Sequence, residues 1–108
     1  MTSGGSAAAG RASHPAIERI VAALERRPFV EEVVLFGSRA VGDAGPRSDI
    51  DLAVRCPAAS ARDWFGLVDA VEEEGETLLE IDLVRLDEAP AELVRQIREE
   101  GITLYERP

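Results

Sequence analysis

The sequence contains no lysine: its twelve basic residues are all arginine, against twenty-one acidic residues. The formal net charge is −9. Because contacts to a phosphate backbone need a positive surface, this charge balance argues against a protein that grips a long nucleic acid. Any cationic side-chain contact to a phosphate must come from arginine, whose planar guanidinium binds oxyanions with two donors.

Cysteine and long apolar runs are also scarce. The single Cys56 cannot form an internal disulfide, which is compatible with a reducing compartment, and we expect a cytoplasmic protein. No run of about eighteen apolar residues occurs, so we expect no transmembrane helix. Residues 1–14 lack both an apolar period and the apolar centre of a secretory signal. Their small and polar residues predict a disordered tail.

Residues 15–108 are expected to form one domain, because 45% hydrophobic content and this length suit a single small core. Apolar residues at helical spacing predict helices after Pro15, after the capping pair Ser60 and Asp63, and after Pro90. A short helix is expected over residues 38–42. Strands are predicted over residues 29–36, 50–55, 79–86 and 102–105. Strands that alternate with helices indicate an α/β two-layer domain.

Two aspartates in the middle of the chain suggest chemistry. Ten residues separate Ser38 from Asp49, and Asp51 follows inside an apolar segment. Residues i and i+2 of a strand share a face, so Asp49 and Asp51 would project side by side. Two carboxylates about 5 Å apart repel by roughly 3 kcal/mol at an effective dielectric near 20. A hard divalent cation such as Mg²⁺ would reverse that cost.

An anion site and a third acid accompany this pair. Gly37 and Ser38 follow an apolar run, and a glycine that ends a strand before a serine presents backbone N–H groups and a hydroxyl to an anion. Asp82 lies in another strand candidate and joins the cluster if the two strands pair. Three acids, a metal pair and an anion-binding turn are typical of phosphoryl or nucleotidyl transfer. For the aspartate pair alone, a solvated sheet face is the alternative.

Two arginines near these motifs allow more than one interpretation. Arg39 directly follows the Gly-Ser turn, where a guanidinium either reaches a nucleotide phosphate or lies on a helix surface. Arg47 and Ser48 precede Asp49 and either line the nucleotide or belong to a solvated loop. The sequence leaves both questions open.

The spacing of Gly37-Ser38 and Asp49-x-Asp51 resembles that of the DNA polymerase beta-like nucleotidyltransferase superfamily. The strings Gly-Ser-Arg-Ala, Ser-Asp-Ile-Asp-Leu-Ala-Val and Glu-Gly-Ile-Thr-Leu-Tyr-Glu are similar to its minimal nucleotidyltransferase (MNT) branch. The resemblance covers roughly residues 15–107. It implies the superfamily's fold, a small mixed sheet with flanking helices. It also implies that Ser38, with Gly37 and Arg39 beside it, holds the nucleotide phosphates.

The same resemblance implies roles for the acids. Asp49, Asp51 and Asp82 would bind two Mg²⁺ ions, for which Mn²⁺ can substitute, and Asp82 would help to activate the acceptor hydroxyl. The expected reaction transfers AMP from ATP to a hydroxyl. MNT proteins typically accompany a HEPN-domain ribonuclease toxin and adenylylate one of its tyrosines. The resemblance therefore implies an antitoxin that forms a hetero-oligomer with such a toxin. From the acidic charge and the lack of a long apolar run we expect no direct nucleic-acid or membrane binding.

Two alternatives stay open at this point. One is a binding-only antitoxin that neutralises its toxin by occlusion and needs no catalysis. The other is a small-molecule nucleotidyltransferase of the aminoglycoside-modifying kind. Such enzymes usually carry an additional helical domain, for which we see no counterpart among these residues.

Overall fold

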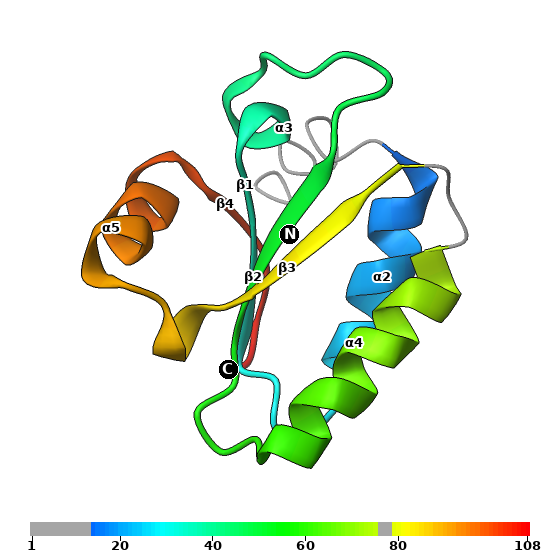
Figure 1. The fold of residues 1–108 in the computed structure, drawn as a ribbon, viewed down its shortest axis with the longest axis vertical. Helices are drawn as coiled ribbons and strands as arrows, with labels where there is room; N and C mark the ends of the chain where they lie inside the picture. Colours follow the sequence, from blue (N-terminus) through cyan, green and yellow to red (C-terminus); the bar gives the residue numbers. More distant parts are fainter. Residues whose placement is uncertain (1–13, 76–78) are drawn as a thin grey trace.

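The computed structural model describes residues 14–75 and 79–108, which form a sheet with helices on both faces (Figure 1). Across the described part of the sheet the strand order is β3-β2-β1-β4. β2 pairs with β3 in parallel, whereas β1 is antiparallel to both β2 and β4. The predicted mixed sheet with flanking helices is confirmed. The strands are β1 (Glu32–Phe36), β2 (Ile50–Arg55), β3 (Ile81–Arg85) and β4 (Ile102–Glu106).

The helices divide between the two faces of the sheet. Figure 1 shows α2 and α4 together on one face, α5 on the other, and the short α3 beyond the end of β1. No helix in the described part of the chain is long and apolar enough to cross a membrane. The helices are α2 (Pro15–Glu25), α3 (Ser38–Val41), α4 (Ala61–Gly75) and α5 (Ala91–Glu100), with a 3₁₀ turn η1 (Leu86–Glu88) before α5.

Helix starts follow local sequence signals. The predicted capping pair is present: Asp63 N donates to Ser60 Oγ, and Ser60 N donates to Asp63 Oδ2, both at 3.0 Å. Of the predicted tail, only His14 lies within the described residues. Its ring Nδ1 accepts a hydrogen bond from Ala16 N at 3.1 Å and so caps α2.

Two predicted strands are too long. The sequence predicts a strand over 29–36, but β1 begins at Glu32. The residues before it form a turn, in which Val30 N donates to Arg27 O at 3.1 Å. The sequence also predicts a strand over 79–86, but β3 spans only residues 81–85 because Leu86 opens the 3₁₀ turn. The second strand has its predicted bounds.

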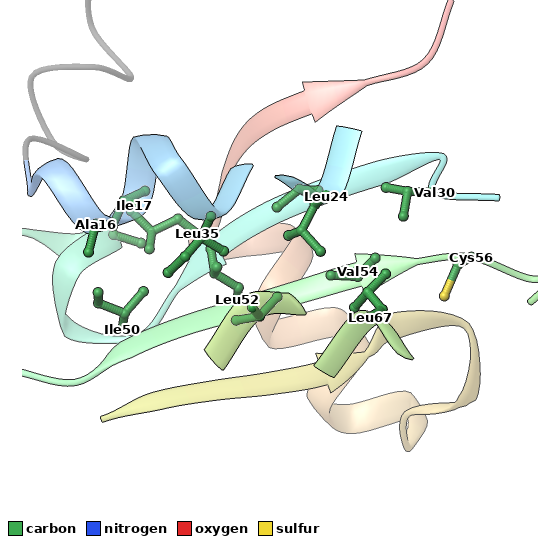
Figure 2. Packing of buried hydrophobic residues seen from close by; sticks show 14 of the residues in the cluster. Ala16, Ile17, Leu24, Val30, Leu35, Ile50, Leu52, Val54, Cys56 and Leu67 are labelled. Carbon is green, nitrogen blue, oxygen red and sulfur yellow. The ribbon is translucent and has the colours of Figure 1, made fainter. Parts of the chain in front are cut away.

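The main core lies between the sheet and the α2–α4 layer. Successive strand residues face opposite sides, so alternate apolar residues of β1 and β2 point towards these helices. Figure 2 shows their side chains converging with those of α2 and α4. The fully buried members include Ile17, Ile20, Leu24, Val33, Leu35, Leu52, Val54 and Leu67.

A smaller core lies under α5, on the opposite face. Val34 of β1 and Ala53 of β2 pack there with Ile97 and Leu86. At one end of this face Glu32, only 4% exposed, accepts hydrogen bonds from Arg98 of α5 and from Arg55 of β2. The ion pair of Arg98 with Glu32 attaches α5 to the sheet. The opposite end of the same face, where β1 ends and β2 begins, carries the predicted acids.

Candidate active site

Asp51 and Asp82 lie side by side on the sheet face that carries α5. Asp51 is two residues before Ala53, which packs under α5, so both belong to that face. The antiparallel register pairs Phe36 with Asp51, and the parallel register pairs Asp51 with Asp82. The strand pairing on which the predicted cluster depends is therefore present.

Asp49 lies outside this strand ladder. It precedes β2, is solvent-exposed, and is followed by Ile50, whose N–H donates to the Glu80 carbonyl at 2.9 Å. In residues 14–75 and 79–108, no three acidic, histidine or cysteine side chains are placed to hold one metal ion together. The structure thus joins two of the three predicted acids directly, and Asp49 stands near them at the end of a loop.

The electrostatics of Asp51 reflect its crowded position. Burial raises the pKa of its carboxyl to about 6, with further increases from the charge of Asp82, a side-chain hydrogen bond with Asp82, and the charge of Asp49. A carboxylate in such a place is stabilised by a cation, and carboxylate oxygens are ligands that Mg²⁺ and Mn²⁺ prefer. The adjoining carboxylates of Asp51 and Asp82 are therefore ligands of the type that a hard divalent cation takes.

Gly37 brings the Gly-Ser turn against this acid. The glycine has φ +75°, a conformation that other residues rarely adopt. A Cβ atom at this position would lie 2.3 Å from Asp51 Oδ2. Only glycine lets the turn backbone approach the carboxylate so closely. Ser38 follows at once and begins α3, so its hydroxyl lies at the same end of the sheet as Asp51.

Arg39, the third predicted phosphate contact, has a partner within the protein. Its Nε and Nη2 both donate to the Ser48 carbonyl, at 3.1 and 2.8 Å. Ser48 Oγ in turn accepts a hydrogen bond from Gly45 N at 2.9 Å. These contacts tie α3 to the loop that leads into Asp49. Arg47, in the same loop, is exposed.

Sequence reasoning missed the two contacts that build this site. The contact of Gly37 with Asp51 and that of Arg39 with Ser48 each join residues separated by nine or more positions. Both depend on the antiparallel pairing of β1 with β2. A glycine directly after an apolar strand is a signal for a special backbone conformation. Nothing in the sequence marks Arg39 as a ligand of a backbone carbonyl.

Known proteins share this fold. A toxin–antitoxin crystallised with AMP-PNP matches with a TM-score of 0.68 and 26% identity, over 83% of this chain and 73% of that one. A mutant MntA–HpeT toxin–antitoxin matches with a TM-score of 0.66 and 25% identity, over 83% and 72%. A tri-AMPylated Shewanella oneidensis HEPN toxin in complex with MNT antitoxin matches with a TM-score of 0.62 and 24% identity, over 83% of this chain and 69% of that one. At this identity the match shows a likeness of fold alone.

Sequence comparisons point to the same group. No curated protein gives a significant match to the chain. Residues 18–108, however, match the family model described as "Polymerase beta, Nucleotidyltransferase". The match covers nearly all of the described residues, including the Gly-Ser turn and the three acids. It confirms the resemblance seen in the motifs: the chain belongs to the polymerase beta nucleotidyltransferase family.

Proposed function

We propose that this nucleotidyltransferase transfers AMP from ATP to a tyrosine hydroxyl of a HEPN-domain toxin and thereby acts as its antitoxin. The observation that carries the reaction type is the packing of the Gly37-Ser38 turn against Asp51, which in turn adjoins Asp82. The choice of partner is supported by the likeness to a toxin–antitoxin crystallised with AMP-PNP. Assignment of the partner rests on that likeness and on the MNT-type motifs.

Asp49, Asp51 and Asp82 are the residues that would hold Mg²⁺, or Mn²⁺ in its place. Divalent cations bound there supply charge neutralisation for the triphosphate and for the attacking and leaving oxygens. Asp51 and Asp82 stand in paired strands that are in register with each other. Asp49 would contribute its carboxylate from the loop that precedes β2.

The remaining steps belong to the chain's own groups. The tyrosine oxygen attacks the α-phosphorus of ATP, the bond to the β-phosphate oxygen breaks, and pyrophosphate leaves. Asp82 is exposed at the edge strand, where it can accept the phenol proton. The Ser38 hydroxyl donates a hydrogen bond to the β- and γ-phosphates, which leave as pyrophosphate. Because Gly37 has no side chain, phosphates held by this turn lie close to the acids.

Intact-mass spectrometry tests the proposal. A HEPN toxin encoded beside this chain, incubated with the protein, ATP and Mg²⁺, is expected to gain the mass of one or more AMP units. Peptide mapping should place them on tyrosine. The Asp51→Asn variant and a chelator-treated sample serve as controls and should leave the toxin mass unchanged.

The binding-only alternative predicts the opposite behaviour. Toxin neutralised by occlusion regains full ribonuclease activity when the complex is separated, whereas adenylylated toxin stays inactive because the added phosphate is covalent and negative. An unmodified toxin, neutralised equally well by the Asp51→Asn variant, would reject the catalytic proposal. AMP transfer to an aminoglycoside instead of the toxin would favour the small-molecule alternative.

A further inference from the structure

We infer that Arg39 is a positioning residue for Asp49 and does not serve as a phosphate ligand. The inference rests on the metal site of the proposed function. Two donors of the guanidinium, Nε and Nη2, converge on the carbonyl oxygen of Ser48, the residue immediately before Asp49. A forked contact of this kind restricts both the position and the orientation of the carbonyl.

The peptide bond carries this restriction to the aspartate. The carbonyl of Ser48 and the N and Cα atoms of Asp49 belong to one planar unit. When the guanidinium fixes the Ser48 oxygen, it therefore also fixes the start of Asp49. On the other side, Ile50 is held by its hydrogen bond to Glu80 O. Asp49 is thus held between two fixed points, although its side chain is exposed.

Asp49 needs this support more than the other two acids do. Asp51 and Asp82 stand in paired strands, whose ladder sets their positions. Asp49 follows a loop that contains Gly45 and Pro46. Arg39 extends from α3, the helix that begins with Ser38. One short helix therefore links the nucleotide-holding serine to the placement of a metal-binding acid.

The experiment measures Mn²⁺ binding to the purified chain of 108 residues in the absence of nucleotide. The electron paramagnetic resonance signal of free Mn²⁺ gives the bound fraction. Loss of a positioning contact to a metal ligand typically weakens affinity by about tenfold or more. Arg39→Ala is therefore expected to raise the Kd for Mn²⁺ about tenfold. Arg39→Lys should give a smaller increase, because an ammonium group can still donate to the carbonyl but cannot form the fork.

Arg47→Ala is the matched control, because it removes the same charge from the loop that precedes Asp49 and leaves the Arg39–Ser48 contact in place. Electrostatics alone predicts that loss of a positive charge beside the acids tightens cation binding. The positioning role predicts weaker binding for Arg39→Ala, so the two explanations differ in sign. Arg47→Ala is expected to bind Mn²⁺ as tightly as the wild type or more tightly. Circular dichroism checks that each variant is folded.

A double-mutant cycle tests whether the effect passes through Asp49. Asp49→Asn should weaken Mn²⁺ binding, and adding Arg39→Ala should weaken it no further, since the positioned ligand is already lost. In the transfer assay at saturating Mn²⁺, the KM for ATP of Arg39→Ala should equal that of the wild type. A phosphate ligand would instead raise this KM.

Any one of three results would overturn the inference without affecting the proposed function. These are unchanged or tighter Mn²⁺ binding by Arg39→Ala, additive effects of the two mutations in the cycle, and a raised KM for ATP. A wild-type chain that binds no Mn²⁺ would overturn both the inference and the proposed metal site. If the Mn²⁺ results hold but no toxin is modified, the proposed partner fails and the role of Arg39 stands.

Discussion

At the scale of single residues, the contact between Gly37 and Asp51 makes a glycine part of the site. Two separate constraints act at Gly37: its backbone has φ +75° and ψ −157°, and a Cβ atom there would lie 2.3 Å from Asp51 Oδ2. Gly42 instead lies in the left-handed helical region, with φ +89° and ψ +9°, and a Cβ there would meet nothing within 4 Å. A substitution at Gly42 therefore measures a backbone penalty without a steric clash.

Gly37→Ala is expected to destabilise the domain by about 1–3 kcal/mol, from the strained backbone and the clash with the carboxylate. Gly42→Ala should cost about 1–2 kcal/mol, the penalty for a left-handed residue alone. Denaturant unfolding in the presence of a chelator measures both changes. The loss from Gly37→Ala should shrink in an Asp51→Ala background, where the clashing group is absent. An undiminished loss there would contradict the contact.

Asp51→Asn is expected to abolish AMP transfer while leaving the metal-free protein at least as stable as the wild type. The amide keeps the shape of the side chain but removes a charge that Asp82 and Asp49 repel. Chemical unfolding at pH 8 with chelator should show that the unfolding free energy of the variant equals that of the wild type or exceeds it by about 1 kcal/mol. Near-normal transfer by this variant would contradict the assignment of Asp51.

At the scale of elements, an ion pair between a buried glutamate and a partly exposed arginine attaches α5 to the sheet. Glu32 of β1 is 4% exposed and accepts hydrogen bonds from Arg98 of α5 and Arg55 of β2. The hydrogen bond from Arg98 is the main cause of a lowered pKa for Glu32, against the effect of burial, and Arg55 adds to it. The charged form of Glu32 is therefore favoured in the folded state.

A lowered pKa in the folded state means that Glu32 contributes stability above its ordinary pKa of 4.5. This contribution is lost as the pH falls through the lower, folded-state value. We expect Glu32→Gln to reduce the unfolding free energy by about 1–3 kcal/mol at pH 7. The difference from the wild type should decline in more acidic solution, which urea unfolding across a pH series measures.

Glu31→Gln provides the control for this prediction. Glu31 also pairs with Arg55, at 2.7 Å, but both side chains are more than a third exposed. An exposed ion pair is worth about 0–1 kcal/mol, so this variant should change stability little. Equal losses from the two variants at pH 7 would show that burial of Glu32 adds nothing to its ion pairs.

At the scale of the whole molecule, cation binding should stabilise a chain with a formal charge of −9. With Mg²⁺ at ten times its dissociation constant, linkage adds about 1.4 kcal/mol to the unfolding free energy. For a domain of this size we expect a rise in Tm on the order of 5–10 °C. Differential scanning calorimetry measures the shift, and Asp51→Asn should reduce it. An unshifted wild-type Tm in excess Mg²⁺ would contradict the metal site.

The sequence by itself determined the features that depend on neighbouring residues. The bounds of β2, the capping pair Ser60–Asp63 and the Gly-Ser turn at the end of β1 all follow from local signals. The type of chemistry also followed from the sequence, because the Asp-x-Asp pair and the Gly-Ser turn are short motifs whose spacing along the chain can be read directly. Strand ends were less predictable, since hydrogen-bonded partners decide where a ladder begins.

Only the tertiary structure decided how these pieces meet. Strand register placed Asp82 beside Asp51 and left Asp49 outside the ladder. The antiparallel pairing of β2 with β1 places Gly37 next to the Asp51 carboxylate and allows Arg39 to donate to the Ser48 carbonyl. The burial of Glu32, an acidic residue at a strand start, required an arginine from α5, 66 positions away. Such contacts join residues distant in sequence, and their free energies depend on register and packing, which local patterns do not specify.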